Sequence, residues 1–474
     1  MRSVRAIPAA AVFALATVLT LLGSWIPSYW NDEAATLRLA RLPLDELLAF
    51  VQQKDAVHAV YALLMHGWIA VAGESELAVR APSAVATGAA AVGVLVLLRE
   101  AGPPRAAVLA AIVFVLLPRS SFNGTEARSY ALTTALVVWA AVLVLRAARD
   151  GGAVRWVAVV VVAGAANAVF LYSVLVLPTF VVLAAAVAER RRRAVVVGSI
   201  AALLSALAAI PILVLAAGQS SQIGWLRSQP VNAWTVVVEP FFGSSWWLAA
   251  LVVAVLAVAA ARTRRTTLPI LPALVLWLLA PAVILLVASA VVGPSYTPRY
   301  LSMSSPALAM LLGLALATWR PVVSAALVGV LAAASLPALL GMRTETGKPA
   351  GQDLRALART IEEGALPGDA FLLDDTGTVS LRPRVALAAY PDAFAGLDDV
   401  ALLAPYPTTG SYSDALLDDA ELRAALEGES RVWVAVPDSD PDAFAWLREE
   451  GFEPGEQVRV PTVVVTLWQR EASG

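Results

Sequence analysis

The sequence predicts an all-α polytopic membrane protein with about eleven transmembrane helices and a small C-terminal extracytoplasmic α/β domain. The chain of 474 residues is 59% hydrophobic and only 15% charged, whereas soluble domains average roughly 45–50% apolar and about 25% charged residues. Apolar runs of about 17–25 residues recur up to residue 340, and each is long enough to cross a bilayer as a helix. The charge balance then reverses, from 23 Lys/Arg against 12 Asp/Glu up to residue 342 to 11 against 24 after it.

This reversal predicts a transmembrane module over 1–342 and an extracytoplasmic α/β domain over 343–474. The N-terminus, MRSVR, is expected in the cytoplasm. The run from Ile7 to Ile26 is expected to be a retained first span, because bulky aromatic residues follow it and no small-residue cleavage pattern does. The chain has no cysteine, which excludes disulfides and thiolate metal sites.

Arginine-rich loops mark the cytoplasmic side of the predicted spans. The loops are RSVR (2–5), REAGPPR (99–105), RAARDGGAVR (146–155), ERRRR (189–193), RTRR (262–265) and WRP (319–321). They predict further spans near 82–98, 106–118, 130–146, 155–170, 171–188, 194–217, 246–261, 268–292, 300–318 and 321–341.

The segment 57–73 does not fit this alternation, because counting it as a span would move every later loop to the wrong side. It carries two histidines, a tryptophan and two glycines, and we expect it to lie along the outer surface as an interfacial helix. This leaves a first outer loop from about 27 to 80 and an outer C-terminus.

The C-terminal domain alternates predicted helices and strands. The helices are expected over 351–364, 414–430 and 441–452, and the strands over 370–375, 431–437 and 457–470. The domain has no glycine-rich phosphate loop and no nucleophile elbow, so the sequence assigns it no chemistry; an acidic outer domain is suited to help bind the acceptor.

Polar residues that do not serve as cytoplasmic anchors gather at the predicted outer interface. They are Asp32, Glu33, Lys54, Asp55, His58, Arg80, Glu126, Arg128, Tyr130, Arg299 and Tyr300. A carboxylate beside hydrocarbon costs several kcal/mol unless it is paired or used. Loops at the rim of a rigid helical scaffold are common places for a site.

At these positions the sequence resembles the GT-C glycosyltransferases, which use lipid-linked sugars. The resemblance covers most of residues 10–320 and begins with the carboxylate after the first span, in WNDEAAT (30–36). The stretch 55–85, DAVHAVYALLMHGWIAVAGESELAVRAPSAV, resembles the D-x-x-H-P-P-L-Y-Y core and later R-L-P-S-A of the protein O-mannosyltransferase and aminoarabinose transferase relatives. TEARSYAL (125–132) and PRYLSMSSPAL (298–308) are similar to that group's second-loop and late R-Y motifs. Ala59 and Val60 stand where prolines usually stand, and the nearest likeness is to actinobacterial members that are usually called mannosyltransferases.

The resemblance implies transfer of a sugar, above all mannose, from a polyprenyl-phosphate donor to an extracytoplasmic hydroxyl with inversion. Asp32 would be the general base, with Glu33 as helper or structural neighbour. Arg299 is the first choice for the donor phosphate, followed by Arg80, Arg128, Lys54 and Tyr300. Asp55, His58, Glu126 and Tyr130 would orient the acceptor or hold an arginine.

The expected partners are the polyprenyl-phosphate sugar, membrane lipid and a glycan, glycolipid or protein acceptor; nucleic acid is not expected. No cofactor or metal is expected, because a phosphomonoester is a sufficient leaving group.

Each of these residues also has a purely structural interpretation. Asp32 and Glu33 suit the first turn of a helix, which Asn31 would then cap. Arg80 can be a snorkelling anchor, Glu126 and Arg128 a mutual pair, and Arg299-Tyr300 an interfacial anchor. His58 and His66 are then ordinary residues of the interfacial helix.

Two alternative functions remain: an arabinofuranosyl or other sugar transferase of the same type, and a lipid or polysaccharide transporter. A transporter needs polar or broken-helix features near the midplane. Here Asn167 is the main polar residue inside a predicted span, which favours the enzyme. The enzyme hypothesis requires Asp32 and Arg299 to meet in one cavity at the outer rim.

Overall fold

The structure is a computed structural model that describes residues 8–262 and 268–470. The chain divides into two units. We call the first the helical unit; it comprises the chain up to Ser24, Asp55–Tyr61 and Leu77–Gly341. The second, the mixed unit, comprises Trp25–Lys54, Ala62–Glu76 and the chain from Met342. The predicted loop RSVR (2–5) and residues 263–265 of RTRR lie outside the described residues.

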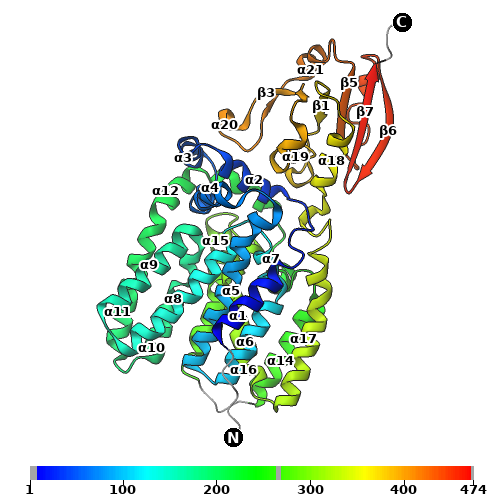
Figure 1. Ribbon diagram of the computed structural model, residues 1–474. Helices are drawn as coiled ribbons and strands as arrows, with labels where there is room; N and C mark the ends of the chain where they lie inside the picture. The colour runs from blue at the N-terminus through cyan, green and yellow to red at the C-terminus, as the bar shows by residue number, and fades with distance from the viewer. Residues whose placement is uncertain (1–7, 263–267, 471–474) are drawn as a thin grey trace. The chain divides into compact units, whose positions relative to one another are not determined.

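The helical unit is built from helices that run side by side as a bundle (Figure 1). They are α1 (Ala9–Leu21), η1 (Ala56–His58), α5 (Glu76–Ala101), α6 (Pro104–Leu116), α7 (Pro118–Gly124), α8 (Tyr130–Asp150), α9 (Ala153–Val169), η2 (Leu171–Val176), α10 (Leu177–Val187), α11 (Arg191–Ala206), η3 (Leu207–Ala209), α12 (Ile210–Gly218), η4 (Ser220–Ser228), η5 (Trp234–Val238), α13 (Glu239–Phe242), α14 (Trp246–Arg262), α15 (Leu271–Val291), η6 (Pro298–Ser304), α16 (Ser305–Leu316) and α17 (Pro321–Gly341). Helix α4 (Ala59–Ala72) begins in this unit and continues in the mixed unit.

Among the described residues, six helices are long and apolar enough to cross a membrane, or up to eight if each of two bent pairs is one span. The bent pairs are α6 with α7, at 65°, and η5–α13 with α14, at 93°. Helices α1, α9, η2–α10 and the segment Ala56–Ala72 are apolar but shorter. The prediction of a helical multi-pass membrane protein is therefore confirmed, while the number eleven stays a prediction.

Close packing of small residues holds the bundle together, as shown by α6 and α16. A side chain at Gly313 of α16 would come within 2.5 Å of the Ala106 carbonyl oxygen and 2.6 Å of Ala110 Cβ on α6. Small residues let two backbones approach this closely, which is how helices associate in a lipid environment.

The mixed unit joins the residues after α1 to the C-terminal part of the chain. Its helices are α2 (Asn31–Arg41), α3 (Leu44–Gln53), η7 (Pro349–Gly351), α18 (Leu354–Gly364), η8 (Val379–Leu381), α19 (Val385–Ala389), η9 (Pro391–Phe394), α20 (Tyr406–Thr409), α21 (Asp419–Ala425) and η10 (Ala445–Arg448). Its strands are β1 (Ala370–Leu373), β2 (Asp398–Asp399), β3 (Leu402–Ala404), β4 (Ala415–Leu416), β5 (Arg431–Pro437), β6 (Phe452–Val460) and β7 (Val463–Arg470).

The central sheet of the mixed unit has the order β2-β1-β5-β7-β6, and Figure 1 labels its strands β1, β5, β7 and β6. Strand β1 runs parallel to β2 and β5, and β7 runs antiparallel to β5 and β6. Helix α18 packs on α19, and α19 in turn packs on α2. The predicted α/β character of this part of the chain is confirmed, and β5 has the bounds that the sequence predicts.

Three predicted elements of this part differ from the structure, two in kind and one in its bounds. The strand expected over 457–470 is a hairpin, because the chain reverses at Pro461-Thr462, where Thr462 has a φ of 68°; an internal proline disfavours one continuous strand. The helix expected over 441–452 is a 3-10 turn, η10, whose bonds join Leu447 N–H to Phe444 O at 3.1 Å. The helix expected from residue 414 begins at Asp419, where an Asp418–Glu421 capping box starts it.

Candidate functional site

Arg299 and Tyr300 lie on the 3-10 turn η6, which leads into α16. The Ser302 hydroxyl donates to the Arg299 carbonyl at 2.6 Å, which fixes the turn. The Arg299 guanidinium lies 5.6 Å from the centroid of the Trp225 ring, and a face-on cation at this distance is attracted by the ring. The turn therefore presents an arginine and a tyrosine from a defined backbone.

An aromatic cluster surrounds Tyr300. The ring of Tyr172, on η2, stacks on it with centroids 4.2 Å apart, and Phe170 meets it at 5.6 Å. The His58 imidazole stacks on the other partner, Phe170, at 5.9 Å with planes inclined by 19°. Tyr130 meets both His58 and Phe170 edge-on. Residues from η1, α8, η2 and η6 thus converge.

Charged groups lie within electrostatic range of this cluster. The positive charges of Arg128 and Arg299 both act on the buried His58 imidazole. Asp55 and Arg299 act on the Tyr300 phenol. The structure therefore brings together six residues that the sequence singled out, Asp55, His58, Arg128, Tyr130, Arg299 and Tyr300. His58 also shares a 3.2 Å hydrogen bond with Ser129 Oγ.

Glu126 and Arg128 lie in the bend after α7, and both are buried. The Arg128 backbone N–H donates to the Glu126 carbonyl at 2.9 Å. Arg119, on α7, lies within electrostatic range of Glu126 and Arg299, and its guanidinium donates to the Glu239 carbonyl at 3.0 Å. Arg119, which the sequence analysis did not single out, thus belongs to the same region as Arg128 and Arg299.

Asp55 has a left-handed backbone conformation with a φ of 56°. Residues other than glycine, Asn and Asp rarely adopt this conformation. The Asp55 carbonyl accepts from the His58 N–H at 2.9 Å, and the next N–H, of Ala56, donates to Gln219 Oε1 at 3.0 Å. Unusual backbone of this kind concentrates at functional sites.

Arg80 is not a snorkelling anchor, because its side chain is completely buried. Its guanidinium donates to the carbonyl of Ser24, which follows the end of α1 at Leu21. This contact joins α5 to the chain that follows the first helix. Asn167 is likewise satisfied: its amide donates to the Ser205 carbonyl at 3.0 Å and accepts from Ser173 at 2.6 Å. The main polar residue inside a predicted span therefore joins neighbouring segments of the bundle.

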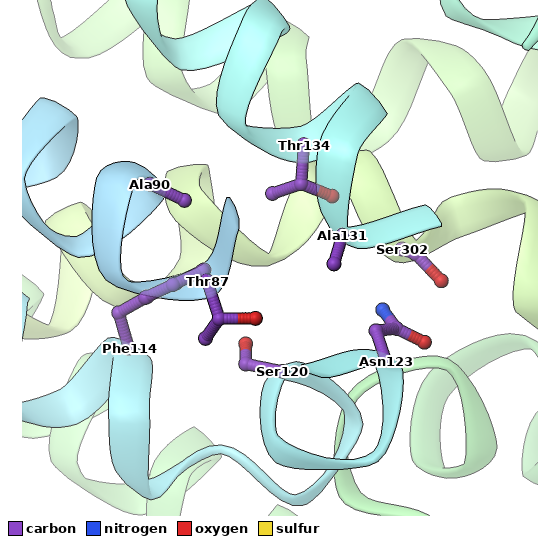
Figure 2. A pocket seen from close by; sticks show the side chains of 8 residues that line it. All are labelled: Thr87, Ala90, Phe114, Ser120, Asn123, Ala131, Thr134 and Ser302. Atoms are coloured by element: carbon purple, nitrogen blue, oxygen red, sulfur yellow. The ribbon is translucent and has the colours of Figure 1, made fainter. Parts of the chain in front are cut away.

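A small polar cavity lies near η6 (Figure 2). It is lined by Thr87, Ala90, Phe114, Ser120, Asn123, Ala131, Thr134 and Ser302. Its volume, about 10 Å³, is close to what one water needs. Ser120 Oγ and Asn123 Oδ1 have no hydrogen-bond partner within the part of the chain that the structure describes. The cavity therefore suits one water that satisfies these two atoms next to Ser302.

Asp32, Glu33 and Lys54 belong to the mixed unit. Asp32 lies partly exposed in the first turn of α2, and its carbonyl accepts from the Thr36 hydroxyl at 3.2 Å. Asn31 does not cap this helix, because it is already helical and Trp30 is the N-cap residue. Glu33 is completely buried and pairs with Lys348 Nζ at 3.6 Å. Lys54 ends α3.

His66, on the part of α4 that belongs to the mixed unit, donates from Nδ1 to the Ala40 carbonyl at 2.9 Å. This contact ties α4 to α2 and agrees with the structural interpretation of this histidine. Asp32 and Arg299 lie in different units, so the requirement that they meet stays a prediction.

The sequence did not single out Phe170, Tyr172, Arg119, Gln219 or Lys348. Phe170 and Tyr172 stand at the boundary of two predicted spans, a position that is also typical of interfacial aromatic residues. Arg119 follows the predicted span 106–118 directly, which was an available signal. Nothing local to Lys348 indicated its partner.

Chemically, the helical unit offers several cations beside aromatic faces, and the mixed unit offers a partly exposed carboxylate at the start of a helix. Guanidinium groups bind phosphate oxygens in a planar fork. Aromatic faces suit sugar rings and lipid. A carboxylate accepts a proton from a hydroxyl. The helical unit thus carries groups that can bind a phosphate, and the mixed unit carries a group that can accept a proton.

Comparison with known proteins identifies chains with a similar fold. Residues 58–216 match the family model of dolichyl-phosphate-mannose-protein mannosyltransferases, and no curated protein sequence matches the chain. ArnT from Cupriavidus metallidurans, solved with undecaprenyl phosphate, is similar with a TM-score of 0.61 and 13% identity, over 97% of both chains. The AglB oligosaccharyltransferase of Archaeoglobus fulgidus, solved with an inhibitory peptide and a dolichol-phosphate, is similar with a TM-score of 0.51 and 12% identity, over 94% of this chain and 72% of AglB.

Proposed function

We propose that this chain, which has the fold of the GT-C glycosyltransferases, transfers a sugar from a polyprenyl-phosphate donor to an acceptor hydroxyl. The observation that carries the proposal is the cluster around Arg299 in the helical unit. There Arg299 and Arg128 act on a group of aromatic side chains that includes His58 and Tyr300. Cations beside aromatic rings, on a multi-pass membrane scaffold, suit a lipid phosphate that carries a sugar.

In the proposed reaction the acceptor oxygen attacks the anomeric carbon of the donor. The new C–O bond forms as the bond from that carbon to the phosphate oxygen breaks, and the phosphate leaves with the electron pair. Asp32 takes the hydroxyl proton as general base. Arg299 stabilises the charge that develops on the leaving phosphate. Attack from the face opposite the phosphate inverts the anomeric configuration.

Arg128 is a second phosphate ligand in this proposal, and Arg119 is added to the candidates because it lies near Arg299. Lys54, Arg80 and Tyr300 remain further candidates for the donor phosphate. Asp55, His58, Glu126 and Tyr130 are proposed to orient the acceptor or to hold an arginine in place. Glu33 is assigned the structural alternative, since its carboxylate is buried against Lys348.

Mannose is the proposed sugar, supported by the family model that matches residues 58–216. The acceptor is a glycan, a glycolipid or a protein on the extracytoplasmic side, where the mixed unit is proposed to lie. Undecaprenyl phosphate and dolichol phosphate in the similar structures support a lipid-linked donor.

The test is transfer of label by membranes that contain the protein. Membranes receive radiolabelled polyprenyl-phosphate mannose or, separately, polyprenyl-phosphate arabinose, and labelled product is scored. Asp32→Asn and Arg299→Gln are each expected to reduce transfer at least about a hundredfold. If only the arabinose donor supports transfer, the donor sugar is arabinose and not mannose. A block in export, with transfer unchanged, would favour the transporter instead.

The requirement that Asp32 and Arg299 serve one donor is testable because the chain has no cysteine. Cysteines introduced at Asn31 and Ser295, which are both partly exposed and lie near the two residues in the sequence, are the only thiols. A short bismaleimide is expected to cross-link the two cysteines. Bound polyprenyl phosphate is expected to slow this cross-linking. Absence of cross-linking with each cysteine singly reactive would contradict the shared site.

A further inference from the structure

The side chains of Glu33 and Lys348 form an ion pair that is nearly excluded from water. Their exposures are 0% and 2%, and Nζ lies 3.6 Å from Oε1. Glu33 follows Asp32 on the first turn of α2, whereas Lys348 lies between α17 and α18. Burying two charges carries a desolvation penalty, and a hydrophobic pair of similar volume often gives equal stability. The pair is therefore not explained by stability alone.

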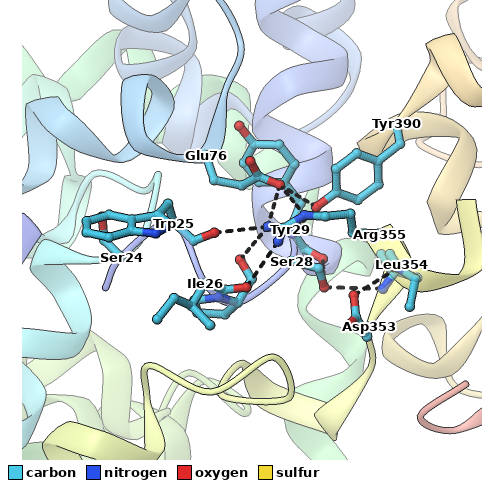
Figure 3. Close-up of polar contacts among 12 residues, drawn as sticks. Ser24, Trp25, Ile26, Ser28, Tyr29, Glu76, Asp353, Leu354, Arg355 and Tyr390 are labelled. Atoms are coloured by element: carbon cyan, nitrogen blue, oxygen red, sulfur yellow. Dashed lines mark hydrogen bonds and ion pairs between the residues drawn. The ribbon is translucent and has the colours of Figure 1, made fainter. Parts of the chain in front are cut away.

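The residues that lead into α2 are held by the start of α18 (Figure 3). The Arg355 guanidinium donates to the carbonyls of Trp25, Ile26 and Pro27 at 3.1–3.2 Å. It also pairs with Glu76 at 2.6 Å. One side chain thus fixes three successive peptide groups.

The next two residues are held in the same way (Figure 3). The Leu354 N–H donates to Ser28 Oγ at 3.2 Å. The Tyr29 N–H donates to the Tyr390 hydroxyl at 2.8 Å, and that hydroxyl donates to Glu76 at 2.8 Å. Segments from the C-terminal part of the chain therefore contact every residue from 25 to 29.

The far end of α2 is held as well. Arg41, its last residue, donates to the Ala388 carbonyl on α19 and pairs with Glu74 at 2.7 Å. On the first turn of α2, Glu33, the residue after Asp32, forms the buried pair with Lys348. The helix that carries Asp32 is thus restrained at its entry, at its first turn and at its end by residues outside it.

We propose that Lys348 is a positioning residue for the transfer reaction, acting on Asp32 through Glu33. This rests on the proposed function, in which Asp32 is the general base. By pairing with Glu33, Lys348 fixes the orientation of the first helical turn, and hence the direction of the neighbouring carboxylate. The C-terminal part of the chain then contributes to catalysis by holding the base.

The test compares Lys348→Met, Glu33→Gln and the double variant Glu33→Gln/Lys348→Met in the full chain. Lys348→Met leaves a buried carboxylate without its partner and is expected to unfold at lower temperature. The double variant removes both charges, and its unfolding temperature is expected to return toward that of the wild type. Its kcat for sugar transfer is expected to stay at least about tenfold low, with the donor KM unchanged, because a misdirected base slows chemistry rather than binding.

A matched control is Arg431→Met, which breaks the Arg431–Asp369 pair at 2.8 Å within the C-terminal sheet. It is expected to leave kcat unchanged. Recovery of both kcat and unfolding temperature in the double variant would overturn the proposal, because the pair would then serve stability alone.

Hydrogen exchange separates this proposal from the proposed function. Amides of α2 (Asn31–Arg41) are expected to exchange faster in the double variant, and those of β5 to be unchanged. If α2 amides exchange faster in the double variant but the wild-type protein shows no sugar transfer, the proposed function is wrong while the restraint on α2 is real. Unchanged α2 exchange together with wild-type kcat would remove the positioning role.

Discussion

The rings of Tyr172 and Tyr300 stack with centroids 4.2 Å apart and planes inclined by 23°. Tyr172 lies on η2 and Tyr300 on η6, so the stack joins two turns that precede apolar helices. Aromatic pairs of this kind contribute about 0.5–1.5 kcal/mol beyond the area they bury. Because Arg299 is the neighbour of Tyr300, the stack also restrains the proposed phosphate ligand.

Removing the stack is therefore expected to reduce transfer without abolishing it. Tyr172→Ala removes the ring that supports η6, and displacement of Arg299 is expected to lower kcat/KM about tenfold. Tyr172→Phe keeps the ring and is expected to retain transfer close to the wild-type rate. Both variants are assayed with the labelled donor; equal loss in both would assign the effect to the hydroxyl instead of the stack.

Asp55 allows backbone strain and charge to be separated. Its φ of 56° is favourable for glycine and tolerated by Asn and Asp. Asp55→Gly and Asp55→Asn are thus expected to keep the unfolding temperature, while Asp55→Val loses about 1–2 kcal/mol of stability. Transfer is expected to fall in all three, since each lacks the carboxylate. Full transfer by Asp55→Asn would show that only the backbone conformation matters.

The contact between α6 and α16 predicts that substitution of Gly313 lowers stability, whereas substitution of a glycine outside this contact does not. Gly313→Ala places a methyl group 2.5 Å from the Ala106 carbonyl oxygen, and the resulting overpacking is expected to cost about 1–3 kcal/mol. Gly329→Ala, on α17, meets nothing within 4 Å and is expected to be neutral or to stabilise by up to about 1 kcal/mol. Thermal unfolding in detergent measures both; equal effects would mean that α6 and α16 are not in contact.

The sequence was sufficient for the helical segments because apolar runs of this length have few alternative structures. It was also sufficient to bring Asp55, His58, Arg128, Tyr130, Arg299 and Tyr300 forward as candidates, since charges beside predicted spans are rare. It was insufficient for their aromatic surroundings. In the sequence Phe170 and Tyr172 look like ordinary interfacial residues, whereas in the structure their rings pack against His58, Tyr130 and Tyr300.

Long-range pairs were beyond local patterns. Glu33 and Lys348 lie more than 300 residues apart in the sequence, and nothing in either neighbourhood indicates the partner. The hairpin of β6 and β7 was within reach, because Pro461 interrupts the apolar run. The 3-10 turn η10 was not, because its apolar spacing is also that of a short helix.

The Asp369–Arg431 pair predicts how the C-terminal sheet responds to acid. Burial tends to raise the pKa of Asp369, but hydrogen bonds from Arg431, the Leu366 N–H and Trp433 outweigh it and hold this pKa below its ordinary value of 3.8. The pair's contribution to stability is therefore fully present above pH 3.8 and is lost as the pH falls through the lowered pKa.

Asp369→Asn removes this group from the titration. The wild-type protein is expected to lose protection of β5 amides progressively below about pH 4, in addition to any general acid effect. The variant is expected to be less protected at pH 6 and to change less between pH 6 and pH 3. Hydrogen exchange of β5 (Arg431–Pro437) across this range is the measurement, with α8 as an internal reference. Parallel pH profiles in the two proteins would contradict the assignment, because the acid dependence would then arise from other carboxylates.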